Sequence, residues 1–183
     1  RLLPVARKWK LATFDDLVRT IRTKMDETAI RDVVEAMTTN ESFFFRDTKP
    51  FDQFKALVLP ALLKSRANNR TIRIWSAACS SGQEPYSIAM LLHEYFPELA
   101  RWRINLLATD ISHEMLRRSR AGRYSQIEVN RGLPTPLLLK WFRQEGAHWH
   151  IDERLRSAVT FSHLNLAQPW PALPAWDLIF LRN

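Results

Sequence analysis

The sequence has 183 residues, of which 46% are hydrophobic and 25% are charged. This length fits one domain of ordinary size, or a small domain joined to a larger one, and the hydrophobic fraction is too high for a disordered chain. No apolar run approaches the roughly 20 residues of a membrane span, and no secretory signal is present, so a cytoplasmic protein is expected. The single cysteine, Cys79, excludes an internal disulfide and a zinc site built on paired cysteines.

Basic residues outnumber acidic ones, with 27 Lys and Arg against 19 Asp and Glu, which gives a net charge of +8. This excess favours an anionic partner such as nucleic acid, a membrane surface or an acidic protein. The densest basic group, residues 117–123, falls at the end of a predicted helix. Because cations near a helix C-terminus suit its dipole, we favour a solvated helix face there over a docking patch.

The first 39 residues show the spacing of a small all-helical region. Thr13 is placed to cap one helix and Asp26 a second, each followed by apolar residues that recur on one face. A third helix is predicted from about residue 50 to residue 65. Its apolar positions are Phe51, Phe54, Leu57, Val58 and Leu62.

From Thr71 the pattern changes to that of an α/β protein. A β-prone run at residues 71–75 is followed by a loop of small and polar residues, a strong helix at residues 84–96, and an apolar run that ends on Asp110. This order of elements predicts a βαβ unit of a nucleotide-binding fold. Continuous apolar runs predict two further parallel strands, at residues 158–162 and 177–181.

The loop after the first strand of this unit favours one class of ligand. Asp110, at the end of the second strand, is placed to accept hydrogen bonds from the ribose of an adenosine. The loop has one glycine, Gly82, where a pyrophosphate-binding loop has three, and Glu84 would repel a pyrophosphate. Glu84 alone is explained by the dipole of its helix, but together these features favour S-adenosylmethionine, which carries an adenosine, an amino group and a sulfonium.

Four ordered motifs resemble those of the CheR-type methyltransferases, which methylate glutamates of bacterial chemoreceptors. The residues that carry the resemblance are Thr39–Arg46, Trp75–Ala89, Ala108–Ser112 and Asp177–Asn183. The resemblance covers nearly the whole chain. It implies a Rossmann-like methyltransferase core over residues 40–183, preceded in the sequence by a helical domain at residues 1–39. One departure is Ala78, where the family often has glycine.

The resemblance also implies which residues bind the cofactor. Asn40, Ser42 and Arg46 match the segment that folds over it, while Glu84 matches the acid at its methionine end and Asp110 the acid on its ribose. Asn165 and Leu166 match the pair beside the adenine, and Arg182 and Asn183 the pair beside the transferring methyl group. We expect the three phenylalanines at positions 43–45 to anchor the first segment on the core.

The implied reaction asks for little acid–base chemistry. A glutamate side chain is ionised at neutral pH, so no general base is needed, and the rate depends on orienting and desolvating the nucleophile. Arg46 and Arg182 are the candidates for holding the substrate carboxylate, because arginine can grip a carboxylate by two hydrogen bonds. Two alternatives stay open for Arg46: it could bind the carboxylate of the cofactor, or it could only pair with Asp47 on the surface. No metal site is expected.

Residues 124–161 form an insertion between the second and third core strands. They are predicted to hold a helix at residues 136–142 and hairpin-like runs at residues 148–151 and 156–161. In the family this region resembles a small antiparallel subdomain that docks a C-terminal peptide of the receptor by adding a strand. The turn at residues 144–147 is short and has a single glycine, so we expect this protein not to depend on that peptide.

The first residue is not Met, so we expect the sequence to start partway into its natural chain. The resemblance implies that C-terminal strands of the core are missing, because the family continues beyond Asn183 into further strands. The predicted partners are the cytoplasmic helices of chemoreceptors, which would bind the basic residues Arg19, Arg22 and Arg31. The protein is expected to be a monomer that neither binds nucleic acid nor inserts into a membrane. Two alternative functions are a nucleic-acid methyltransferase, suggested by the net charge, and a non-catalytic adaptor that binds the cofactor.

Overall fold

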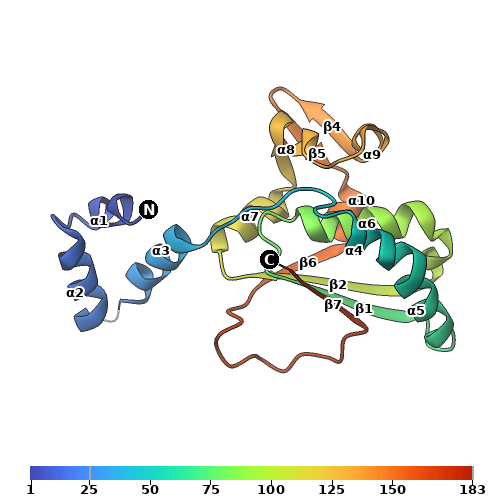
Figure 1. Cartoon of the computed structure of the whole chain (residues 1–183), viewed down its shortest axis with the longest axis horizontal. Coiled ribbons are helices and arrows are strands. Elements are labelled where there is room, and N and C mark those ends of the chain that lie inside the picture. Colours follow the sequence, from blue (N-terminus) through green and yellow to red (C-terminus); the bar gives the residue numbers. More distant parts are fainter. Residues whose placement is uncertain (25, 183) are drawn as a thin grey trace.

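The computed structural model describes residues 1–24 and 26–182 and has a mixed α/β architecture (Figure 1). Three helices form one end of the molecule, a four-stranded parallel sheet lies at its centre, and a three-stranded antiparallel sheet stands on one side. This arrangement confirms the predicted Rossmann-like core with a helical N-terminal region and an inserted antiparallel sheet. None of the described helices is both long and apolar enough to cross a membrane.

The N-terminal region consists of α1 (Leu3–Lys8), α2 (Phe14–Lys24) and α3 (Glu27–Met37). Both predicted caps are confirmed. The Thr13 hydroxyl accepts a hydrogen bond from the Asp16 amide, and the Asp26 carboxylate accepts two from the first turn of α3. Val5, Ala6 and Leu17 are buried between the helices, so this region has a small apolar core of its own.

The central sheet contains β1 (Thr71–Ala77), β2 (Arg103–Asp110), β6 (Val159–His163) and β7 (Leu178–Leu181), all parallel and in the order β6-β2-β1-β7. All four predicted strands are present. The helix after β1 is α6 (Gln83–Tyr95), and a 3₁₀ turn at Pro97–Arg101 leads into β2. The carboxyl ends of parallel strands meet at one edge of the sheet, which is where such folds bind ligands.

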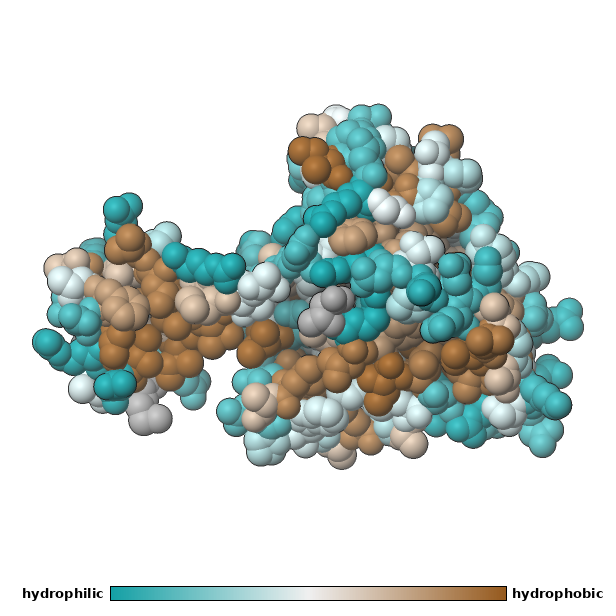
Figure 2. Space-filling model, viewed as in Figure 1, coloured by the Kyte–Doolittle hydropathy of each residue, from teal (hydrophilic) through white to brown (hydrophobic). Residues whose placement is uncertain are grey.

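The two faces of the sheet are covered differently. Ile72 and Ile74 of β1 belong to the main core, which includes α6. Trp75 and Ala77 point the other way and pack against the connector at residues 164–177, which has no regular structure. Figure 2 shows apolar residues over the N-terminal helices and in a band across the core. The edge strand β7 exposes Ile179 and Leu181.

The helix predicted at residues 50–65 is present, but its hydrogen-bond register changes in the middle. It consists of α4 (Lys49–Gln53), a π-helical turn η1 (Phe54–Val58) and α5 (Leu59–Ser65). Pro60 explains the change, because it has no N–H to donate to the carbonyl of Ala56 and its ring crowds that carbonyl. A one-residue register shift in front of the proline relieves the conflict. Phe51 and Phe54 remain buried and contact Phe180 of β7.

The insertion corrects part of the sequence prediction. Its sheet has the order β3-β5-β4, formed by β3 (Arg123–Ser125), β4 (Phe142–Glu145) and β5 (His148–Ile151), with α8 (Gln126–Asn130) and α9 (Thr135–Trp141) between β3 and β4. The hairpin run predicted at residues 156–161 is wrong, since α10 (Glu153–Ser157) and the core strand β6 occupy those positions. Instead β5 lies between β3 and β4 and pairs with both, and β4 begins at Phe142, the last residue of the predicted helix.

The basic cluster at the end of α7 (His113–Ala121) is more than a solvated face. Arg118 forms an ion pair with Glu128 of α8 at 2.7 Å, and Arg120 donates to the Phe161 carbonyl of β6 at 2.8 Å. Arg123 bonds the His148 ring at 2.8 Å, and Arg117 pairs with Glu114. Arg118 and Arg120 therefore connect α7 to the insertion and to the central sheet.

Candidate functional site

A cavity of about 440 Å³ opens at the carboxyl edge of the parallel sheet, a volume in the range of small-molecule sites. Eight of the nine predicted cofactor-binding residues line it, and the ninth, Asn183, lies outside the described residues. The eight come from five separate parts of the chain: Asn40, Ser42, Arg46, Glu84, Asp110, Asn165, Leu166 and Arg182. The fold thus brings together positions up to 142 residues apart (182 − 40).

At one end of the cavity, backbone amides hold the carboxylate of Asp110. This side chain is only 5% exposed. Its Oδ2 accepts a hydrogen bond from the Ser80 amide at 2.7 Å, and its Oδ1 accepts one from the Ser112 amide at 2.9 Å. A carboxylate has about four acceptor positions, so it can accept further hydrogen bonds after these two. Asp110 is therefore fixed in orientation and still able to bind a ligand hydroxyl.

The loop between β1 and α6 has unusual backbone geometry. Ala78 and Ser80 have positive φ angles of 56° and 49°, and Gly82 has 91°. Residues other than glycine rarely adopt this left-handed region, and such strain clusters at functional sites. The family often has glycine at position 78, and glycine would adopt this backbone conformation with less strain than the alanine found here.

Cys79 lies between the two strained residues and is 1% exposed. Burial, followed by the nearby charges of Asp110 and Glu84, raises the pKa of its thiol far above the usual range. The thiolate is the reactive form of cysteine, so this side chain is unsuited to act as a nucleophile. It packs as a small apolar group.

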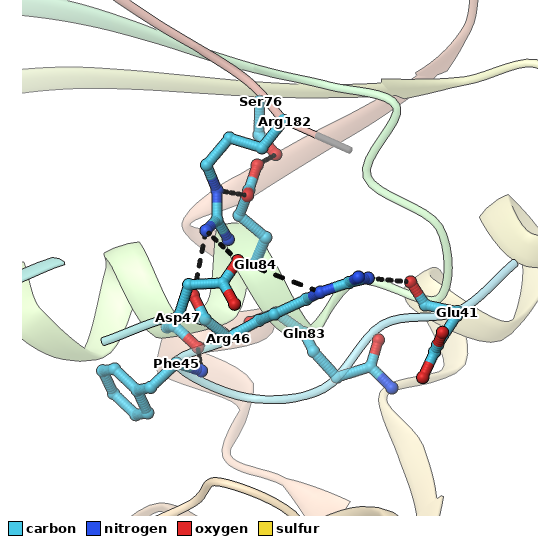
Figure 3. A network of polar contacts seen from close by, with 9 residues as sticks. Glu41, Phe45, Arg46, Asp47, Ser76, Gln83, Glu84 and Arg182 are labelled. Carbon is cyan, nitrogen blue, oxygen red and sulfur yellow. Dashed lines mark hydrogen bonds and ion pairs between the residues drawn. The ribbon is translucent and has the colours of Figure 1, made fainter. Parts of the chain in front are cut away.

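At the other end of the cavity, Glu84 and Arg182 form a buried ion pair (Figure 3). The distance from Arg182 Nε to Glu84 Oε2 is 2.7 Å, and the two side chains are 16% and 11% exposed. Ser76 donates to the other oxygen of Glu84 at 2.8 Å. Arg182 also donates to the Arg46 carbonyl at 2.9 Å, so it joins β7 to the segment at residues 38–46. Sequence reasoning placed both residues in the site but did not foresee their pairing.

Arg46 lines the cavity and is also held by its own segment. Its guanidinium donates to the Glu41 carbonyl at 2.8 Å, and its Nε lies 4.0 Å from Asp47 Oδ2. Behind it, Phe44 is fully buried against Tyr124 and Phe142, as expected for an anchor. The Phe45 amide donates to Ser87 Oγ of α6 at 3.0 Å. The segment is thus fixed on the core while the Arg46 side chain reaches the cavity.

Glu35 is a residue near the site that sequence reasoning missed. Its carboxylate on α3 accepts hydrogen bonds from the Ser112 hydroxyl, the His113 amide at 2.6 Å and the Glu114 amide at 3.3 Å. It therefore caps the N-terminus of α7 from another part of the chain. In the sequence, Ser112 marks a helix start, but no pattern identifies a distant glutamate as a second cap.

The arrangement suits an adenosine that carries an amino acid chain. Asp110 can accept hydrogen bonds from ribose hydroxyls, and the cavity wall beside it includes Ile111, Leu164 and Leu166, which offer apolar surface to a base. The Glu84 carboxylate at the opposite end can accept hydrogen bonds from an ammonium group. The residues present therefore fit S-adenosylmethionine.

Comparison with known proteins agrees with this geometry. Residues 40–183 match the family described as CheR methyltransferase, SAM binding domain. The chain belongs to the CheR methyltransferase family. This CheR-family match includes every residue that lines the cavity except Thr38 and Thr39, so the cavity lies in an S-adenosylmethionine-binding domain.

Individual CheR relatives are similar over the whole length of the chain. Chemotaxis protein methyltransferase 1 of Pseudomonas aeruginosa is 39% identical, with 100% of this chain and 68% of the relative covered. Chemotaxis protein methyltransferase Cher2 of Pseudomonas putida is 36% identical, with the same coverage. The chemotaxis protein methyltransferase of Vibrio parahaemolyticus is 39% identical over 100% of this chain and 66% of its own length.

Proposed function

We propose that this protein transfers a methyl group from S-adenosylmethionine to glutamate side chains of chemoreceptors, forming glutamyl methyl esters that adapt chemotactic signalling. The observation that carries the proposal is one cavity lined by two carboxylates, Asp110 and Glu84, and two arginines, of which Arg182 pairs with Glu84 while Arg46 lies beside that pair. Membership of the CheR methyltransferase family supports the proposal, and so do the relatives, which are chemotaxis protein methyltransferases.

The cofactor would be held at both ends of the cavity. In the proposal Asp110 binds its ribose, Glu84 its amino group, and Asn165 with Leu166 its adenine, while Asn40 and Ser42 close over it. When bound, the cofactor supplies an electrophilic methyl group on a sulfonium. Arg182 orients the Glu84 carboxylate by its ion pair.

The protein's own part in the reaction is to place a carboxylate. A substrate glutamate is ionised at neutral pH, so no side chain of the site has to remove a proton. We propose that Arg46 and Arg182 orient that carboxylate, because a planar guanidinium holds it in a defined direction. Bringing the two reactants into line and excluding water accounts for the rate.

The receptor-binding surface is proposed to include the basic residues Arg19, Arg22 and Arg31 of the N-terminal helices, all exposed. Among the residues that the structure describes, the only ion-pair partner of Arg19 is Asp16, at 3.9 Å. Charge-steered encounters slow as salt rises, because ions screen exposed charges. The methylation rate at subsaturating receptor should therefore fall with ionic strength, and a flat rate would exclude electrostatic docking.

A nucleic-acid substrate receives no support from the basic cluster on α7, since its arginines contact neighbouring groups of the same chain.

We further propose a cytoplasmic monomer that does not require a receptor tail peptide. The turn that leads from β4 to β5 is short, and its single glycine, Gly146, has a φ of 60°.

The substrate class is tested with labelled S-adenosylmethionine and the full-length protein. Receptor cytoplasmic fragments should accept label that alkali releases, because methyl esters hydrolyse in base and N-methyl groups do not. DNA and RNA should accept none. Label on nucleic acid alone would overturn the proposal, and cofactor binding without any transfer would favour an adaptor.

A further inference from the structure

Asp47 lies next to both arginines that are proposed to hold the substrate. One oxygen, Oδ2, is 3.4 Å from Arg182 Nη1 and 4.0 Å from Arg46 Nε. Figure 3 shows the Asp47 carboxylate between the two guanidinium groups. A carboxylate shared by two arginines is the arrangement that the substrate glutamate needs in order to react.

The contacts of Asp47 are weak compared with those of Glu84. Glu84 is 11% exposed and lies 2.7 Å from Arg182, whereas Asp47 is 58% exposed and its two distances are longer. Exposed ion pairs contribute about 0–1 kcal/mol, while breaking a buried pair costs several times more. An arriving carboxylate would therefore displace Asp47 and leave the Glu84 pair in place.

The turn that carries Asp47 keeps its carboxylate near the arginines. Phe45, Asp47 and Thr48 all have positive φ angles, of 52°, 63° and 26°. Asp and Asn are the residues besides glycine that tolerate this region best. Asn at position 47 should therefore keep the backbone of the turn and remove only the charge.

We propose that Asp47 is an internal competitor that occupies the substrate-carboxylate position on Arg46 and Arg182 until a receptor glutamate displaces it. The inference rests on the proposed function. Asp47 would thus set the KM for the receptor without taking part in the reaction. It is a specificity-determining residue, because weakly held carboxylates would fail to displace it.

The test compares Asp47→Asn with Asp52→Asn in the full-length protein. Asp52 is exposed on α4 and forms no ion pair among the residues the structure describes. Each substitution removes one negative charge, so the two variants have the same net charge. Asp47→Asn should lower the receptor KM about two- to fivefold, the scale of one exposed ion pair, with kcat within about twofold. Asp52→Asn should leave KM unchanged, and neither variant should alter cofactor affinity or thermal melting.

Three results would overturn the competitor role. A raised KM or a reduced kcat in Asp47→Asn would show that Asp47 positions the arginines. An unchanged KM would show that it does not compete. An equal fall of KM in both variants would assign the effect to overall charge. If the wild-type protein bound receptor fragments without methylating them, the proposed function would fail, and the receptor Kd of the two variants would still decide the role of Asp47.

Discussion

The two ends of the cavity are built in different ways. At the Asp110 end, two backbone amides of neighbouring loops fix a carboxylate. At the Arg182 end, side chains from β7, α6 and the segment at residues 38–46 hold one another by ion pairs and hydrogen bonds. Backbone amides are set by the fold, whereas long side chains can exchange partners. In the proposed account both ends hold the cofactor; the first is rigid, and at the second Asp47 gives way when a substrate carboxylate arrives.

The largest expected effect lies at the rigid end. Asp110→Ala should weaken binding of S-adenosylmethionine by about 1.5–3 kcal/mol, because charged hydrogen bonds to the ligand are lost. Isothermal calorimetry measures this directly. The matched control is Asp177→Ala, which removes a buried carboxylate that accepts from the Arg73 amide outside the cavity.

Asp177→Ala should lower the melting temperature and leave cofactor affinity unchanged. Equal cofactor affinity in the wild type and in Asp110→Ala would remove Asp110 from the site.

Arg46→Lys probes the other end. The change keeps the charge but replaces a planar fork with a flexible point charge, so turnover should fall roughly 10- to 100-fold while the fold is retained. Steady-state kinetics with a thermal-melting control measures it. Arg131→Lys is the comparison variant, because Arg131 pairs with Glu41 and stacks on Phe43 of the same segment without lining the cavity. Near-normal turnover in Arg46→Lys would mean that Arg46 is structural.

The smallest expected effect concerns the strained loop at the Asp110 end. Ala78→Gly should raise the free energy of unfolding by about 0.5–1 kcal/mol, since glycine adopts a φ of 56° without the Cβ clash. Ala61→Gly, at an exposed position within α5, should lower the free energy of unfolding by about as much, because glycine is a poor helix former. Denaturant titration checks both, and a destabilised Ala78→Gly variant would contradict the strain argument.

The sequence predicts the rigid end better than the other. Asp110 was found because it ends a strand of a recognisable βαβ unit, and the strands themselves follow from continuous apolar runs. The Glu84–Arg182 pair joins residues 98 apart, and the contact of Glu35 with α7 spans 77 to 79 positions. Such contacts depend on tertiary packing that no local pattern encodes. The β4 strand was missed for a related reason, because the apolar spacing of α9 continues into Phe142 without a break.

The most direct test of the central claim is to locate the transferred methyl group. A receptor fragment that has reacted with S-adenosylmethionine and the full-length protein can be digested and mapped by mass spectrometry. The account predicts methyl groups on glutamate side chains, lost after brief treatment with alkali, and many fewer of them after reaction with Asp110→Ala at a cofactor concentration near the wild-type Kd. Methyl groups that resist alkali and lie on lysine or arginine side chains would contradict it.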